Sequence, residues 1–107
     1  PRNYGTFPRV LALYCRERKA LPYEAAIHKM TAAPAARMRL GDRGRIAPGT
    51  FADLVVFDPV RVADRATFEN PHQYPVGIQH VMVNGSWVLR DGEHTGARPG
   101  RVIKPTA

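Results

Sequence analysis

Between Gly44 and Gly92 the chain alternates short apolar runs with turn-forming residues, and this alternation restricts the fold more than any other feature. Ile78–Val83 and Ser86–Arg90 are two runs of strand-forming residues separated only by Asn84-Gly85. An Asn-Gly pair favours a type I′ turn, because both central positions of that turn have positive φ. The sequence therefore predicts an antiparallel β-hairpin, followed by another turn at Asp91-Gly92.

The pattern also predicts a register for this hairpin. Counting outward from the two-residue turn places Met82 opposite Trp87 and Val81 opposite Val88. Apolar side chains then occur on both faces of the hairpin. Such a pattern is typical of strands that lie between two layers of structure.

Further strands are expected on both sides of the hairpin. Ala52–Phe57 is a compact run of β-branched and aromatic residues, closed by Asp58-Pro59, since proline cannot donate a hydrogen bond to a strand ladder. Arg61–Pro75 is polar and contains proline, which is typical of a long surface connection. Arg101–Ile103 is predicted to add a last short strand.

The first forty residues have the periodicity of helices. The first helix is expected to start at Thr6 as its N-cap and to end in a solvated turn at Arg16–Lys19. A second helix is expected from Pro22, and a third from Pro34 to Met38, before a boundary at Gly41. The buried face of the first helix is predicted to consist of residues at i, i+3, i+4 and i+7, namely Phe7, Val10, Leu11 and Tyr14.

Composition limits the classes of protein that fit the chain. With 107 residues, 44% of them hydrophobic, it is long enough for one small core and too apolar to be disordered. No apolar run approaches the roughly 20 residues of a membrane span. A net charge of +7 raises the hypothesis of nucleic-acid binding, but the basic residues are scattered and no reader motif accompanies them. We therefore expect neither a nucleic-acid partner nor a membrane.

The chain has few side chains of the kinds that catalyse reactions or bind metals. The four histidines, His28, His72, His80 and His94, lack the spacing of a metal-binding pair, so no metal site is predicted within the chain. Cys15 is the single cysteine; it is expected to be a small buried residue and fits a reducing, cytoplasmic compartment. Asp53 and Asp58 flank a predicted strand, where turn-forming aspartates are common. No catalytic residue is predicted.

One N-terminal segment keeps two interpretations open. Pro1–Arg9 places Arg2, Asn3 and Tyr4 together in an expected loop just ahead of the first helix. On composition the segment is an exposed loop. The alternative is a binding role, because the planar fork of an arginine can hold a carboxylate through two parallel hydrogen bonds.

Several segments together are similar to the C-terminal portion of D-aminoacylases, the zinc N-acyl-D-amino-acid deacylases of the amidohydrolase superfamily. The resemblance covers nearly the whole chain. Its general motifs, found across many amidohydrolases, are Gly44–Phe57 and Val81–Trp87. Its more specific motifs are Pro1–Leu11 (PRNYGTFPRVL), Glu24–Thr31 (EAAIHKMT), Pro34-Ala35 and Phe68–Ile78 (FENPHQYPVGI).

The resemblance implies an α+β chain that contributes to two parts of a larger enzyme. Residues 1–40 would be a helical segment from the end of the catalytic (β/α)₈ barrel. Residues 41–107 would be the C-terminal part of the small β domain, an antiparallel sheet or sandwich whose other strands come from an upstream segment. This division agrees with the change of period at Gly41.

The resemblance also implies a chemistry that this chain carries only in part. In such enzymes zinc activates a water, an aspartate transfers the proton, and the amide of an N-acyl-D-amino acid is hydrolysed. The zinc ligands and the catalytic aspartate would lie upstream, so no catalytic or metal-binding residue is expected here. Only Arg2 matches a functional position of the family, where it would bind the α-carboxylate of the substrate.

Two interpretations therefore compete. In the first, the chain is the C-terminal fragment of a zinc deacylase, and the isolated chain is not catalytic. In the second, it is a freestanding, non-catalytic structural or interaction module derived from that family. The β edges exposed by the missing strands would be covered by the rest of the hydrolase chain or by self-association.

Overall fold

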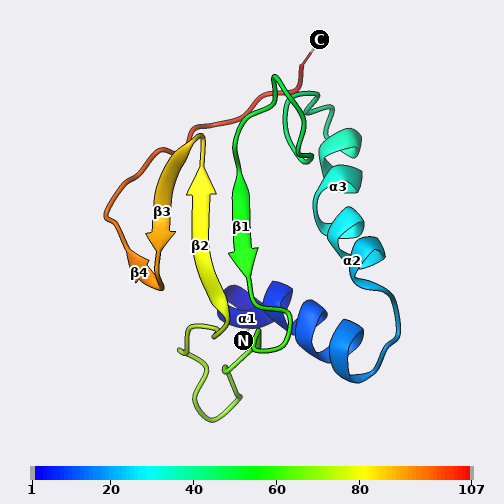
Figure 1. Cartoon of the computed structure of the whole chain (residues 1–107), viewed down its shortest axis with the longest axis vertical. Coiled ribbons are helices and arrows are strands. Elements are labelled where there is room, and N and C mark those ends of the chain that lie inside the picture. The colour runs from blue at the N-terminus through cyan, green and yellow to red at the C-terminus, as the bar shows by residue number, and fades with distance from the viewer. Residues whose placement is uncertain (1, 107) are drawn as a thin grey trace. The chain divides into compact units, whose positions relative to one another are not determined.

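The computed structural model describes residues 2–106 and has the α+β architecture that the sequence predicts. Helical segments come first, at α1 (Arg2–Arg9), η1 (Val10–Glu17), α2 (Tyr23–Met30) and α3 (Ala32–Arg37). Four strands follow, at β1 (Leu54–Phe57), β2 (Ile78–Val83), β3 (Ser86–Arg90) and β4 (Glu93–His94). They form one antiparallel sheet in the order β1-β2-β3-β4, with β1 at one edge (Figure 1).

The first helix differs from its prediction in both start and buried face. It begins at Arg2, so the predicted N-cap at Thr6 is wrong. From Val10 the backbone is a π-helix, whose longer turn no longer follows a period of 3.6 residues. Of the predicted face only Leu11 is buried, whereas Phe7 is 65% exposed and Tyr14 37% exposed. The buried face consists instead of Leu11, Ala12 and Cys15.

The other two helices agree with the sequence to within two residues. α2 begins directly after Pro22 and buries Ala26, while His28 lies exposed, as its place on the polar side predicts. α3 covers most of the predicted segment and ends before Gly41. The change from helices to strands around this position is therefore correct.

The β-hairpin confirms the strand bounds and the turn. Asn84 and Gly85 have φ values of 49° and 78°, as a type I′ turn requires. Met82 pairs with Trp87 as predicted, but Val81 pairs with Leu89. The prediction of Val88 at that position is wrong, because β3 carries a β-bulge there and Val88 is the extra residue. The carbonyl oxygen of Val88 accepts a hydrogen bond from the Thr95 amide instead, at 2.9 Å.

The sheet also ends differently from the prediction. Asp91 and Gly92 have φ values of 52° and 79° and form the expected second turn, which leads into the two-residue strand β4. Arg101–Ile103, the predicted last strand, has no regular secondary structure. In that tail, the Thr106 amide donates a hydrogen bond to the carbonyl oxygen of Arg39, so the end of the tail is bound to the loop after α3.

The segment Arg61–Pro75 is the long connection that the sequence predicts, but one of its residues is central to the core. Val62 is 0% exposed and is the most deeply buried large side chain among the described residues. The Arg16 guanidinium donates hydrogen bonds to the carbonyl oxygens of Val62 and Pro59, at 2.7 and 3.0 Å. Arg16 is therefore bound to this connection, whereas the sequence predicted a solvated side chain.

The contacts divide the chain into two compact units. The first consists of Pro1–Ala26 and Phe57–Ile78, and the second of Ile27–Val56 and Gln79–Ala107. Each unit therefore combines helical residues with residues of the β-rich half. No helix among the residues described is long and apolar enough to cross a membrane.

Cys15 is buried as predicted, and its burial leads to a testable difference in reactivity. Burial raises the pKa of the Cys15 thiol, since an apolar surrounding favours the neutral form over the thiolate that reacts. We expect iodoacetamide to alkylate Cys15 slowly in the folded protein and rapidly in urea, as followed by mass spectrometry. Equal rates in the two states would contradict this description of the helix.

The same shift predicts a pH dependence of stability. The folded-state pKa of Cys15 lies above the unfolded-state value, so its contribution is fully present below the unfolded pKa. That contribution is lost as the pH rises through the folded pKa. Stability should therefore decrease more steeply at alkaline pH in the parent sequence than in a Cys15→Ala variant.

Candidate functional site

The predicted binding residue, Arg2, begins α1. The sequence placed it in a loop, and this is wrong, because Arg2–Arg9 is helical. The residues that follow Arg2 make tertiary contacts that stabilise this turn. These contacts override the preference of Thr6 for the N-cap position. The side chain of Arg2 lies outside what the structure describes, so its role in substrate binding stays a prediction.

An aromatic cluster forms around Tyr4, two residues after Arg2 in α1, within one compact unit. The Tyr4 ring contacts the His72 ring edge-on, with 5.5 Å between centroids and an interplanar angle of 74°. It also contacts the Tyr74 ring at 5.7 Å. His72 and Tyr74 come from the long connection after β1, so the cluster joins α1 to a segment nearly 70 residues away in sequence. We call Tyr4, His72 and Tyr74 the aromatic cluster.

The same helix lines a hollow of about 430 Å³. Its walls are mainly apolar, and the residues that line it are Asn3, Tyr4, Thr6, Phe7 and Pro8. The exposed ring of Phe7, which the sequence predicted to be buried, belongs to this surface. The first two turns of α1 therefore combine a predicted carboxylate-binding arginine with an apolar surface.

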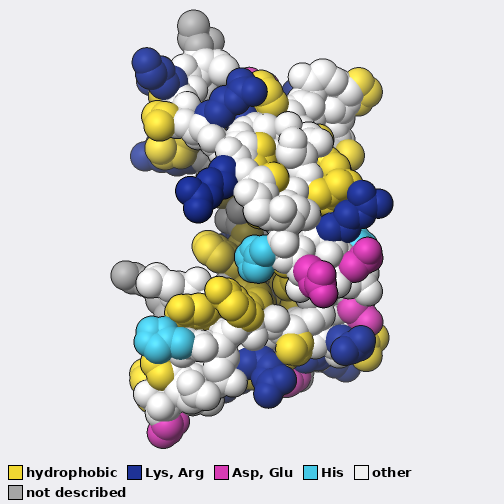
Figure 2. Space-filling view, turned by 90° about the vertical axis from the view of Figure 1, so that its left-hand side faces the viewer, with side chains coloured by type: hydrophobic (Ala, Val, Ile, Leu, Met, Phe, Trp, Pro, Cys, Tyr) yellow, Lys and Arg dark blue, Asp and Glu magenta, His cyan; other side chains and the backbone are white. Residues whose placement is uncertain are grey.

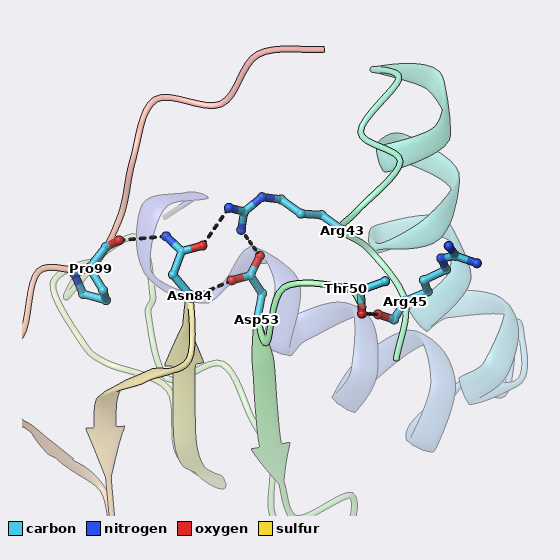
Figure 3. A network of polar contacts seen from close by, with 6 residues as sticks. All are labelled: Arg43, Arg45, Thr50, Asp53, Asn84 and Pro99. Carbon is cyan, nitrogen blue, oxygen red and sulfur yellow. Dashed lines mark hydrogen bonds and ion pairs between the residues drawn. The ribbon is translucent and has the colours of Figure 1, made fainter. Parts of the chain in front are cut away.

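A second group of polar residues holds the other unit together (Figure 3). The Arg43 guanidinium donates to the Asp53 carboxylate and to the side-chain oxygen of Asn84, the latter at 2.7 Å. The Asn84 side-chain nitrogen donates to the carbonyl oxygen of Pro99 at 2.7 Å, and the Asn84 amide donates to Asp53 at 2.8 Å. The guanidinium also lies 4.2 Å from the centre of the Phe51 ring. These contacts join the segment before β1, the hairpin turn and the C-terminal tail.

This network has a structural role, which a substitution can test. We expect Arg43→Lys to lower the free energy of unfolding by about 1–2 kcal/mol, because one ammonium cannot replace a planar fork bonded to two acceptors. Arg45, whose side chain is exposed and directed away from the network in Figure 3, provides the matched control. Arg45→Lys should change stability by less than about 0.5 kcal/mol in chemical denaturation. Equal effects of the two substitutions would contradict the role of Arg43.

Two further residues singled out from the sequence have structural partners. Asp58 accepts hydrogen bonds from the amides of Val60 and Arg61, as expected for a turn-forming aspartate. His80 lies in β2, where its Nδ1 accepts a hydrogen bond from the Asp91 amide at 3.0 Å and its ring lies against Trp87. Within residues 2–106, no three His, Cys, Asp or Glu side chains are grouped so that they could hold a metal ion.

Basic side chains do not form a continuous patch on the face drawn in Figure 2. Lys and Arg are interspersed there with acidic, apolar and uncharged surface (Figure 2). Nucleic-acid binders of high net charge usually concentrate their cations along one face or groove. This face therefore gives no support to the nucleic-acid hypothesis.

Comparison with known proteins decides the family. Residues 1–89 match the model of the Amidohydrolase family, Amidohydro_3. The chain belongs to the amidohydrolase family. Over 107 residues this amidohydrolase chain is 51% identical to the D-aminoacylase of Alcaligenes xylosoxydans xylosoxydans, covering 100% of this chain and 22% of that protein.

Solved structures of amidohydrolases share the fold. A structure of D-aminoacylase described for its binuclear metal center superposes with a TM-score of 0.90 at 50% identity, covering 92% of this chain and 21% of that chain. The N-acyl-D-glutamate deacylase of Bordetella bronchiseptica, complexed with zinc and a phosphonate inhibitor, superposes with a TM-score of 0.85 at 44% identity and the same coverage. This chain thus spans about a fifth of the length of these relatives. The recognition of the D-aminoacylase family from sequence motifs is confirmed.

Two features of this amidohydrolase chain were not found from the sequence. His72 and Tyr74 were assigned to a surface connection, and no spacing rule links them to Tyr4. The network around Arg43 was also missed. Asn84 was identified only as a turn residue, although a positive-φ Asn beside a hairpin also has a free side-chain amide that can join neighbouring loops.

Proposed function

We propose that this chain is the C-terminal part of an N-acyl-D-amino-acid deacylase. The observation that carries the proposal is 51% identity to a D-aminoacylase along the full length of the chain. A TM-score of 0.90 to a D-aminoacylase structure supports it from the fold. The complete protein would hydrolyse the amide bond of N-acyl-D-amino acids and release a carboxylate and a free D-amino acid.

The metal of the proposed enzyme would be held outside this chain. The relatives include a D-aminoacylase with a binuclear metal center and a deacylase complexed with zinc. The residues described here do not fit such a centre, because their His, Cys, Asp and Glu side chains form no metal-binding group. We therefore propose zinc as the cofactor of the parent enzyme, with ligands that lie outside the described residues.

Arg2 would supply this chain's contribution to the substrate site. In the proposed complex its guanidinium donates two parallel hydrogen bonds to the α-carboxylate of the N-acyl-D-amino acid. The apolar hollow lined by Asn3, Tyr4, Thr6, Phe7 and Pro8 of the same helix supports a location close to a small organic substrate. General acid, general base and water activation would all come from the rest of the enzyme.

The second candidate function, a non-catalytic interaction module, is favoured by one specific observation. β1 pairs only with β2 among the described strands, and Val55 and Val56, which point to opposite faces of the sheet, are 55% and 42% exposed. An edge strand with two exposed apolar faces requires a cover. In the deacylase proposal the remainder of the hydrolase chain supplies that cover, and in the module proposal a second copy does.

The intact mass of the natural protein distinguishes these proposals. Isolation from its source cells without a tag, followed by mass spectrometry, should give a mass several times the 11.9 kDa of this chain if it is part of a deacylase. A mass near 11.9 kDa would contradict the deacylase proposal and favour the module.

A further inference from the structure

We propose that His72 and Tyr74 are positioning residues for the substrate carboxylate, because through Tyr4 they hold the turn of α1 that carries Arg2. This inference rests on the proposed substrate-binding role of Arg2. It assigns a function to the connection after β1. Three sets of contacts within one compact unit hold this turn.

The first set is the aromatic cluster itself. Tyr4 lies two residues after Arg2 in α1, and its ring contacts both His72 and Tyr74, at centroid distances of 5.5 and 5.7 Å. The edge-on angle of 74° with His72 is a favoured geometry for two aromatic rings, since ring edges are positive and ring faces negative. Two ring contacts with the same connection thus hold Tyr4, and with it the start of the helix.

The second set brings the helix backbone against the same connection. A Cβ atom added at Gly5 would overlap the carboxylate of Asp64, so the helix backbone lies directly against this side chain. Asp64 is itself held, since its Oδ1 accepts a hydrogen bond from the Ala66 amide at 2.9 Å. The turn that contains Arg2 and Tyr4 therefore has contacts through both a side chain and the backbone.

The third set consists of hydrogen bonds within the connection, which fix its shape. Ala63 and Val76 exchange two backbone hydrogen bonds of 3.1 Å, which close the connection at its base. Within it, the Gln73 side chain donates to the carbonyl oxygen of Asn70 at 2.8 Å, and the Asn70 amide donates to Thr67 at 2.9 Å. A loop closed in this way keeps a fixed shape, so the rings that it carries hold Tyr4 in a defined position.

The exposure of the His72 and Tyr74 side chains indicates a role in positioning and not in core packing. Tyr74 is 72% exposed and His72 is also exposed, so little apolar surface would be lost from the core if either ring were removed. The loss should therefore affect the placement of Arg2 more than folding. A misplaced binding group reduces binding steeply, because bidentate hydrogen bonds depend on geometry.

The experiment uses the complete hydrolase and an N-acyl-D-amino-acid substrate. In the double variant His72→Ala/Tyr74→Ala we expect KM to rise about tenfold while kcat changes by less than about twofold and the unfolding midpoint stays constant. Phe68→Ala removes a ring that is 93% exposed on the same connection and is the matched control, with no change in KM.

Combination with Arg2→Lys tests whether the effect passes through Arg2. If it does, the rise in KM caused by the double variant disappears in the Arg2→Lys background. Full additivity of the effects would overturn the inference. An unchanged KM in the double variant would also overturn the inference if Arg2→Lys alone raises KM. The proposed function would then still stand. An unchanged KM in Arg2→Lys itself would overturn this inference and the proposed role of Arg2, and the deacylase assignment would still stand on the intact mass.

Discussion

Replacement of Arg2 by alanine in the complete hydrolase is expected to raise KM for N-acyl-D-amino acids by about 100-fold. The substitution removes both charge-assisted hydrogen bonds to the substrate carboxylate, and each is worth about 1.5–3 kcal/mol before water replaces part of the loss. We expect kcat to fall much less, because the amide being hydrolysed is separated from the carboxylate by the α-carbon. Initial rates over a range of substrate concentrations measure both constants.

Two controls make the Arg2 result specific. Arg9→Ala removes an exposed arginine at the other end of α1 and should leave KM unchanged. A substrate analogue in which the carboxylate is an amide should bind the parent and the Arg2→Ala enzyme equally weakly. If the parent enzyme distinguishes the acid from the amide and the Arg2→Ala variant still does so, the carboxylate is bound elsewhere.

The second large effect is expected at Gly77, directly before β2. Gly77 has φ of 81°, and a Cβ atom there would overlap the backbone of Arg61 and Val62, lying 2.5 Å from the Cα atom of Val62 and 2.8 Å from the carbonyl carbon of Arg61. Val62 is fully buried, so its backbone has little room to move. We expect Gly77→Ala to lower the free energy of unfolding by about 3 kcal/mol or more.

A substitution at Gly49 measures the cost of positive φ without the cost of an atomic overlap. It has φ of 84°, but a Cβ atom added there meets no atom within 4 Å. Gly49→Ala should therefore cost only about 1 kcal/mol, the strain of the left-handed conformation. Urea denaturation of the two variants gives the comparison, and a Gly77→Ala protein no less stable than Gly49→Ala would contradict the close packing at Val62.

The sequence predicted the hairpin well because its signals are local. Asn84-Gly85 specifies the turn, and the turn specifies the pairing of Met82 with Trp87. The register beyond that pair was wrong because Val88 is bulged, and its carbonyl oxygen is bonded to Thr95 outside the hairpin. Bulges of this kind depend on the neighbouring chain, which a local pattern does not contain.

The errors in the first helix have a similar origin. Thr6 is a good cap residue by type, yet the turn before it is held by Tyr4 and by the approach of Gly5 to Asp64. The π-helical turn after Arg9 changed which residues are buried, and periodicity rules assume a constant turn. The first of these errors comes from contacts between segments that are distant in sequence.

For the candidate site, the sequence led to Arg2 only through the family resemblance. Composition alone left an exposed loop as the simpler interpretation, and nothing in the spacing joined Tyr4 to His72 and Tyr74. The structure adds these neighbours and the hollow along α1. The division into residues 1–40 and 41–107, as shares of a barrel and a β domain, stays a prediction.

The central claim is tested most directly by assaying the complete natural protein for release of free amino acid from N-acetyl derivatives of D- and L-amino acids. Leucine, aspartate and glutamate derivatives cover apolar and acidic side chains. We expect hydrolysis of at least one D-enantiomer, a much slower reaction of its L-enantiomer, and a KM raised about 100-fold when Arg2 is replaced by alanine. The absence of hydrolysis of every D-derivative, with zinc supplied, would contradict the assignment as a deacylase.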